Sequence, residues 1–130
     1  MHDFRWPALI TLGVLVLLFA LAANVGKARG KYGIKAPATT GSPDFERVFR
    51  VQMNTLENAV MFLPALWLFA AFVSEVWAAA LGTVWLVARV WYAFAYRQDA
   101  AKRGPAFGLS MAAFGVLILG AAWGVVKGFL

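Results

Sequence analysis

A stripe of polar and charged side chains runs along one face of residues 43–68, a segment that begins charged and ends apolar. Four of its members stand at i, i+3, i+7 and i+10, the spacing that places side chains on one face of an α-helix: Arg47, Arg50, Asn54 and Glu57. Burying an arginine and a glutamate among apolar residues is costly unless they meet partners or water. The stripe is therefore a candidate functional site that the rest of the chain must shelter from lipid.

A second stripe ends the third apolar segment, where Arg89, Tyr92 and Tyr96 stand at i, i+3 and i+7. The second helix enters the membrane from the side to which the third exits, so both stripes should share that side. Arginine binds carboxylates through two parallel hydrogen bonds, and Glu57 offers a partner for an ammonium group. This pattern suits a zwitterion, such as a small peptide with two carboxylates and one amine. The alternative is that Arg50 and Glu57 only neutralise partners inside the bundle.

Arg103 lies in the connection before the fourth apolar segment, close to Tyr96 at the end of the third. A guanidinium beside the sulfur of a thiol ligand lowers the thiol pKa and stabilises the thiolate, which is the actual nucleophile. The alternative is a charge that only sets membrane topology. The chain has no cysteine, so we expect no disulfide, no thiolate metal site and no cysteine nucleophile, and we expect no metal cofactor. Sulfur chemistry would have to arrive with a ligand.

Composition identifies the chain as a membrane protein. Of its 130 residues, 62% are hydrophobic and 14% are charged, and the mean hydropathy is +0.72, outside the range of soluble globular proteins. The length allows about four spans of roughly 20 residues. We therefore predict an all-α membrane protein with a single membrane domain over residues 1–130. Its four-transmembrane-helix bundle would have spans at 6–26, 44–73, 76–96 and 105–129.

Local signals indicate where these spans begin, bend and touch. Ser42 followed by Pro43 and Asp44 is typical of a helix N-terminus. Pro64 is expected to bend the second helix or to leave a carbonyl unpaired. Glycines at four-residue spacing in the fourth span predict a face that allows close helix approach: Gly120, Gly124 and Gly128.

The net charge of +6 comes from basic residues in short connections, so membrane topology and anionic lipid explain it better than nucleic acid does. Most of these residues flank the first and third connections, while Arg5 and Lys127 flank the other side. The positive-inside rule therefore places both connections in the cytoplasm and both termini outside. A cleavable signal peptide is disfavoured, because the first apolar run ends in a basic loop: Lys27, Arg29, Lys31 and Lys35.

The order E-R-x-x-R-x-Q-x-N-x-x-E over residues 46–57 resembles the signature of the MAPEG family, the membrane-associated proteins in eicosanoid and glutathione metabolism. Leukotriene C4 synthase and the microsomal glutathione transferases are members of this family. The resemblance extends over most of the chain: Ala28-Arg29, Thr39-Thr40-Gly41, Ala65-Leu66-Trp67, Ala88-Arg89 and Arg103. It implies a homotrimer of four-helix subunits that uses glutathione as co-substrate. Glutathione would bind between neighbouring subunits, and a lipophilic substrate would arrive from the bilayer.

The resemblance also implies a role for each matching position. Glutathione would be bound by the residues that match the family's binding positions or lie beside them: Arg29, Arg50, Gln52, Asn54, Glu57, Arg89, Tyr92 and Tyr96. Arg103 matches the arginine credited with activating the thiol and is the expected catalytic residue. The second stripe is expected to come from a neighbouring subunit. Asn58 and Gly30 depart from leukotriene C4 synthase, which has a tyrosine and an arginine there, and this leaves the substrate open.

Three functions are compatible with these features. The leading one is a glutathione transferase, with or without peroxidase activity, in a bacterial inner membrane. It would join the glutathione thiolate to a lipophilic electrophile or reduce a lipid hydroperoxide. One alternative is a non-catalytic lipid-binding or scaffolding member of the same family, which the arginine at position 103 argues against. The other is a small four-helix transporter, for which Glu57 is the only candidate coupling residue.

Overall fold

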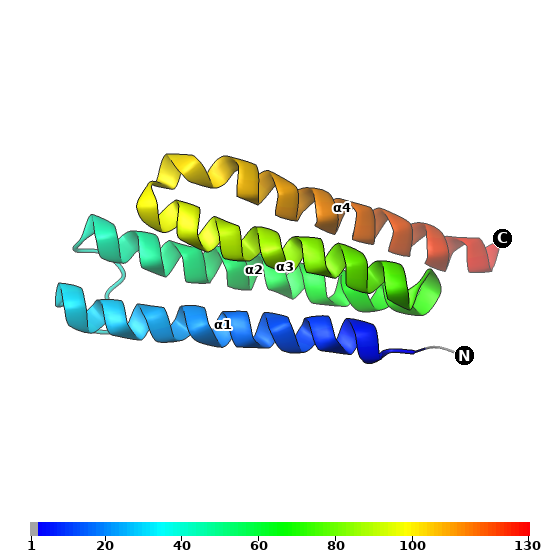
Figure 1. The fold of residues 1–130 in the computed structure, drawn as a ribbon, viewed down its shortest axis with the longest axis horizontal. Coiled ribbons are helices and arrows are strands. Elements are labelled where there is room, and N and C mark those ends of the chain that lie inside the picture. Colours follow the sequence, from blue (N-terminus) through cyan, green and yellow to red (C-terminus); the bar gives the residue numbers. More distant parts are fainter. Residues whose placement is uncertain (1–2) are drawn as a thin grey trace.

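The computed structural model describes residues 3–130, so the first two residues of the predicted domain lie outside the described part. Its helices are α1 (Arg5–Tyr32), α2 (Pro43–Phe72), α3 (Glu75–Gln98) and α4 (Gly104–Val126) (Figure 1). Two short 3-10 segments, η1 (Ala100–Arg103) and η2 (Lys127–Phe129), flank α4. Each of the four helical segments is long and apolar enough to cross a membrane. The prediction of an all-α, four-transmembrane-helix bundle is confirmed.

The helices α2 and α3 form the central pair of the bundle, and α1 and α4 lie on opposite sides of that pair (Figure 1). The connections α1–α2 and α3–α4 lie at one end of the bundle (Figure 1). Both termini and the short α2–α3 turn lie at the other end. We call the end that holds residues 33–42 and 99–103 the loop end. The two polar stripes of the sequence lie toward this end, as expected from their positions in α2 and α3.

Side-chain caps define where the helices begin. The Ser42 hydroxyl accepts a hydrogen bond from the backbone nitrogen of Phe45 at 3.4 Å, and Pro43 occupies the first turn, as predicted. Ser74 caps α3 in the same way, with 3.2 Å between its hydroxyl and the backbone nitrogen of Trp77. At the end of α1, Gly33 has a φ of 68°, a left-handed conformation that favours glycine. These caps satisfy backbone groups that the helix ends leave unpaired.

The first connection is shorter than the sequence analysis expects. Lys27, Arg29 and Lys31, which we assigned to a basic loop, lie in the last two turns of α1. Only Lys35 of that basic cluster lies in the connection itself. Alanine, lysine and arginine are good helix formers, and cations are favoured at the C-terminal end of a helix dipole. The drop in hydropathy after residue 26 therefore marks where α1 leaves the apolar region, and the helix itself continues.

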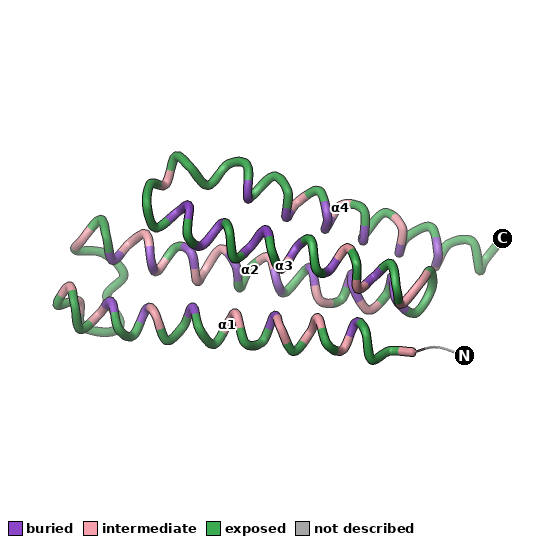
Figure 2. The backbone as a smooth tube through the Cα atoms, in the orientation of Figure 1, coloured by how far each residue is buried: buried purple, intermediate pink, exposed green. Residues whose placement is uncertain are grey.

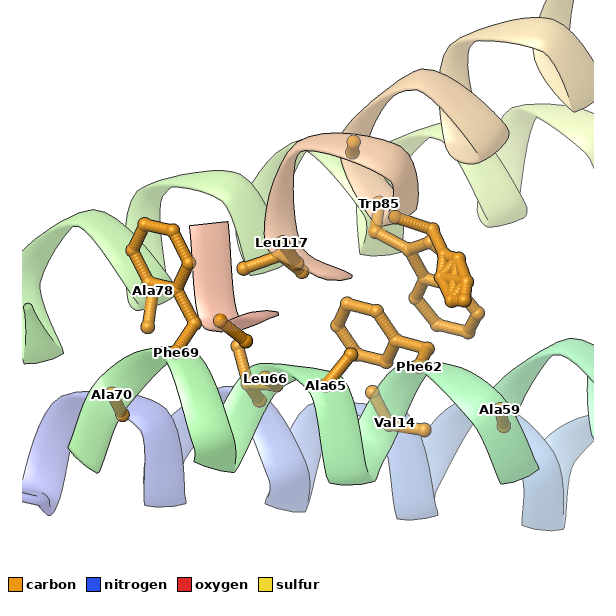
Figure 3. Close-up of a cluster of buried hydrophobic side chains, with 13 residues drawn as sticks. Val14, Ala59, Phe62, Ala65, Leu66, Phe69, Ala70, Ala78, Trp85 and Leu117 are labelled. Atoms are coloured by element: carbon orange, nitrogen blue, oxygen red, sulfur yellow. The ribbon is translucent and has the colours of Figure 1, made fainter. Parts of the chain in front are cut away.

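The core lies where α2 and α3 meet the inner faces of α1 and α4 (Figure 2). Phe62 and Trp85 stack at its centre, with ring centroids 4.0 Å apart and an interplanar angle of 8° (Figure 3). Val14, Leu66 and Leu117 pack around them. Large apolar side chains also cover the outward faces, including Phe19, which is 77% exposed. An apolar exterior of this kind is suited to contact with lipid.

The glycine face of α4 contacts the end of α2 at two of its three predicted positions. A Cβ atom at Gly120 would overlap the ring of Phe69, and one at Gly124 would lie 2.9 Å from the carbonyl oxygen of Phe72. A Cβ atom at Gly128 would meet nothing within 4 Å. Close approach of α2 and α4 therefore depends on Gly120 and Gly124.

Replacing Gly124 with alanine should destabilise the bundle, because its new methyl group would collide with backbone that cannot rotate away. Overpacking of this kind typically costs about 1–3 kcal/mol. Gly128→Ala is the matched control and should leave stability unchanged or slightly higher, because alanine is the better helix former. Thermal unfolding in detergent, followed by circular dichroism, compares the two variants. Equal stability of both would contradict the close contact.

Candidate functional site

The two polar stripes meet within one chain, through the side chain and the backbone of Asn54. Its amide nitrogen donates a hydrogen bond to the Tyr92 hydroxyl at 2.8 Å. Its carbonyl oxygen accepts one from Arg89 Nη2 at 3.0 Å and another from Asn58 Nδ2 at 3.0 Å. The structure therefore places part of the second stripe beside the first in the same subunit. We had expected the second stripe to face α2 from a neighbouring subunit, whereas these contacts join Arg89 and Tyr92 to α2 of their own chain.

Arg89 lies inside the bundle. It is 0% exposed, and its guanidinium carbon lies 4.4 Å from the centroid of the Tyr92 ring. Within residues 3–130, its Nε and Nη1 atoms have no hydrogen-bond partner. Arg89 therefore contacts Asn54 and Tyr92 and does not reach the exterior, where we had expected it to bind a ligand. Its position supports the half-buried Asn54 and the buried Tyr92 that is hydrogen-bonded to it.

Arg89→Met should preserve or raise stability, because buried charges are costly and apolar replacements of similar size are often neutral or stabilising by about 1–4 kcal/mol. The same variant should weaken binding of a ligand at Asn54 and Tyr92, because both lose their support. Unfolding temperature and ligand affinity, measured on one preparation, separate these two effects. Arg89→Lys keeps a charge but loses the planar guanidinium, so it should lower both the stability and the ligand affinity. Unchanged affinity in Arg89→Met would contradict the supporting role.

The charged groups of the α2 stripe remain available in the folded chain. Arg50 and Glu57 are exposed, and neither forms a hydrogen bond or ion pair with any residue in 3–130. Within one chain, Arg50 and Glu57 therefore do not neutralise charged partners inside the bundle, which was the alternative interpretation. Arg47 differs, because it pairs with Asp44 one turn earlier on α2. Arg50 and Glu57 are seven residues apart, about 10 Å along the helix axis at 1.5 Å per residue.

Arg103 is connected to this surface by a row of aromatic rings. Its guanidinium carbon lies 5.3 Å from the Tyr96 ring centroid, and the Tyr96 and Tyr92 centroids are 5.6 Å apart. Tyr92 also contacts Phe107 of α4, with centroids 6.4 Å apart. Arg103 is exposed in η1, so the ring contact orients a cation that still faces outward. Tyr92 and Tyr96 are buried, at 1% and 7% exposure, so this end of the bundle exposes the α2 stripe and Arg103, with the two rings buried.

An apolar groove continues the α2 stripe away from the loop end. The pattern Arg50, Asn54, Glu57 is followed at the same alternating four- and three-residue spacing by Met61, Pro64 and Leu68. These later residues and the facing side of α4 line a groove of about 490 Å³, which we call the α2–α4 groove. The helix α2 continues through Pro64, and Pro64 is exposed in this groove. The groove was not predicted from the sequence, although the continuous helical spacing from Arg50 to Leu68 indicated it.

Arg29 lies away from this surface, at the end of α1. Its Nη1 atom donates to the carbonyl oxygens of Ala38 at 2.7 Å and Ile34 at 3.5 Å. Its guanidinium carbon lies 5.1 Å from the centroid of the Phe45 ring. Because α1 and α4 lie on opposite sides of the bundle, Arg29 and Arg103 of one chain do not meet (Figure 1). Within a chain, Arg29 therefore contacts both the first connection and the start of α2.

Gln52 is half-buried on α2 and, like Arg50, forms no hydrogen bond to any residue in the described part of the chain. Residues 3–130 contain no group of three His, Asp or Glu side chains that is arranged to hold a metal ion. The predicted site residues instead provide cations, amides, hydroxyls and one carboxylate, that of Glu57. This donor set suits an organic zwitterion with carboxylate and ammonium groups.

The chain is similar to known membrane proteins over most of its length. The model of the MAPEG family matches residues 7–123. An uncharacterized protein of Synechocystis is 51% identical over 119 residues, which cover 92% of this chain and 87% of that protein. Human microsomal glutathione S-transferase 2 is 42% identical over 109 residues, which cover 84% and 74% of the two chains. Bovine leukotriene C4 synthase is 37% identical over 119 residues, which cover 92% and 79%.

Proposed function

Because the chain belongs to the MAPEG family, as an integral membrane protein with four spanning helices, we propose that it is a glutathione transferase. It joins the glutathione thiolate to lipophilic electrophiles at the membrane. The observation that carries this proposal is the surface at the loop end, where unpaired Arg50 and Glu57 lie on one stripe with Asn54. The buried hydroxyl of Tyr92 is hydrogen-bonded to Asn54, and the exposed cation of Arg103 lies against Tyr96 at the same end. The names of the human and bovine relatives support the same chemistry.

The charges of the α2 stripe suit the two ends of glutathione, which carries two carboxylates, one ammonium group and one thiol. Arg50 binds a carboxylate through its planar fork, and Glu57 accepts hydrogen bonds from the ammonium group. Their separation of about 10 Å along the helix is on the scale of an extended tripeptide. Asn54 provides a neutral group between the two charges, and the buried hydroxyl of Tyr92 accepts a hydrogen bond from its amide. Gln52 lies on the opposite face of α2, so it would serve this ligand from a neighbouring copy. Tyr96 lies beside Tyr92 and Arg103.

Arg103 holds the sulfur as a thiolate. The thiol loses its proton to water, and the guanidinium stabilises the negative charge that remains on sulfur. The sulfur electron pair then forms a carbon–sulfur bond with the electrophile, and the leaving group departs with the electron pair of the broken bond. With a lipid hydroperoxide, two glutathione molecules become one disulfide, and the peroxide is reduced to an alcohol and water. Proximity of the two reactants in one pocket provides much of the acceleration.

The apolar substrate reaches the thiolate along the α2–α4 groove. The groove opens to the side of the bundle, and its lining is almost entirely apolar. A lipophilic electrophile dissolved in the bilayer enters it without crossing water. The common stripe of α2 then leads from this groove to Asn54 and Glu57. This route separates the water-soluble co-substrate at the loop end from the lipophilic substrate in the membrane.

A homotrimer completes the site in this proposal. Arg29 and Arg103 of one chain lie on opposite sides of the bundle, so both can serve one ligand only if neighbouring copies supply them. The charged stripe of α2 is exposed in one chain, and a neighbouring copy would shelter it from lipid. The basic residues at the loop end favour a cytoplasmic position for that end in a bacterial inner membrane, with both termini outside.

Calorimetry with glutathione on detergent-purified protein tests the proposed function. We expect saturable binding, a defined number of ligands per subunit, and a new thiolate absorption band in the ultraviolet. Addition of chlorodinitrobenzene should then yield the conjugate with release of chloride. Glutathione binding without a thiolate band or turnover would overturn the enzyme and favour the non-catalytic member of the family. Proton-coupled transport in vesicles without glutathione would favour the transporter.

A further inference from the structure

We propose that a second groove, between α1 and α3, binds an anionic phospholipid of the bilayer. The groove lies on the side of the bundle away from the α2–α4 groove and shares no lining residue with it. It has two continuous parts, which have Asn24 and Arg97 in common. One part is basic and lies toward the loop end, and the other is apolar and extends into the membrane. We call the whole feature the α1–α3 groove.

The basic part has the charge that a phosphate group requires. It has a volume of about 110 Å³, and its lining includes Lys27, Lys31 and Arg97. All three side chains are exposed, and none forms an ion pair with any of the residues 3–130. Asn24 is half-buried and lines both parts, and its amide has no hydrogen-bond partner in the described chain. Three cations and one free amide offer donors to a phosphodiester from several directions.

The apolar part of the groove lies at the depth expected for an acyl chain. It has a volume of about 180 Å³, and its lining includes Leu17 and Leu21 of α1 and Val90 and Phe94 of α3. Leu17 lies seven residues below Asn24, about 10 Å deeper along α1. This depth lies within one leaflet, because the hydrocarbon core of a bilayer is about 30 Å thick. A lipid with its phosphate at Lys27 would therefore place an acyl chain along these residues.

The choice of an anionic lipid follows from the residues that are absent from the lining. No aspartate or glutamate lines either part of the groove within residues 3–130. A zwitterionic headgroup would bring an ammonium group to a site that offers it no carboxylate. An anionic headgroup with hydroxyl groups, such as phosphatidylglycerol, meets three cations and an amide in the basic part of the groove, and no carboxylate. Each basic residue near a membrane surface strengthens binding of anionic lipid, and a built groove adds contacts that a diffuse charge lacks.

Native mass spectrometry of the full-length protein, released from nanodiscs with equal amounts of phosphatidylglycerol and phosphatidylcholine, tests this proposal. We expect retention of phosphatidylglycerol over phosphatidylcholine. The combined variant Lys27→Ala, Lys31→Ala and Arg97→Ala should lose this retention by about tenfold or more. The matched control removes three cations outside the groove, with Lys35→Ala, Lys102→Ala and Lys127→Ala, and should retain lipid as the unaltered protein does. Equal loss in both combined variants would show diffuse surface charge and overturn the site.

A second pair of variants tests the apolar part without changing any charge. Ala20→Trp fills the groove from its rim, whereas Ala22→Trp places the same ring on the exposed opposite side of α1. We expect Ala20→Trp to reduce lipid retention several-fold and Ala22→Trp to leave it unchanged, with unfolding temperatures confirming that both fold. The acyl-chain site would be overturned if Ala20→Trp left lipid retention unchanged. It would also be overturned if soluble glycerol phosphate bound as strongly as phosphatidylglycerol. A change in oligomeric mass in place of lipid loss would assign this face to a second copy of the chain.

Discussion

Replacing Arg103 with alanine should lower the rate constant of glutathione conjugation by about 10²-fold or more, as loss of one preorganised charge-stabilising donor does in other enzymes. The guanidinium is exposed and rests on the Tyr96 ring, so its removal leaves no buried group unpaired. Glutathione affinity should change by less than about tenfold, because the carboxylates and the ammonium group keep their partners. The apparent pKa of the bound thiol should rise. Conjugation kinetics, calorimetry and thiolate absorbance against pH measure these three quantities.

Lys102→Ala is the control for Arg103→Ala. Lys102 precedes Arg103 in the same 3-10 turn and is also exposed, and among residues 3–130 it contacts no aromatic ring. Its removal changes the net charge equally, so it should leave the rate constant and the thiol pKa nearly unchanged. Comparable losses in both variants would indicate a general electrostatic effect. Full activity of Arg103→Ala would remove this residue from the mechanism.

Replacing Arg50 with alanine should raise the glutathione dissociation constant by about 10- to 100-fold, since hydrogen bonds to charged groups contribute about 1.5–3 kcal/mol. Arg50 has no partner within residues 3–130, so its loss breaks no internal contact, and stability should stay within about 0.5 kcal/mol of the unaltered protein. Calorimetry measures the affinity, and thermal unfolding measures the stability. The effect on affinity should weaken at high salt, because exposed charges are screened.

Arg47→Ala is the control that distinguishes a specific contact between Arg50 and glutathione from a general effect of the positive charge on the stripe. Arg47 lies one turn before Arg50 on the same helix face, but its guanidinium is already paired with Asp44. Its removal should therefore change glutathione affinity by only a few-fold. If Arg47→Ala and Arg50→Ala weaken binding equally, the stripe acts as a diffuse attractive surface. In that case the assignment of Arg50 to a carboxylate would be wrong.

The chain's helices and its polar stripes were predictable because both depend on local patterns. Hydropathy indicated four spanning segments, Ser42-Pro43 indicated where α2 begins, and the 3.6-residue period placed Arg50 and Glu57 on one face. The end of α1 was harder to predict. Lys27 and its neighbours lower the hydropathy without ending the helix, because polarity and helix propensity are separate properties. The sequence signalled the membrane boundary more clearly than the helix end.

By itself, the sequence determined that this is a four-helix membrane protein whose charged stripe on α2 must be sheltered from lipid. Only the tertiary structure decided which neighbours each stripe has. Arg89 lies inside the bundle and contacts Asn54 and Tyr92. Arg50, which shares the α2 stripe with Asn54, is exposed. Both grooves likewise arise between helices whose relative positions no local pattern specifies. Helical periodicity states which residues share a face, whereas the packing of separate helices decides whether that face is covered.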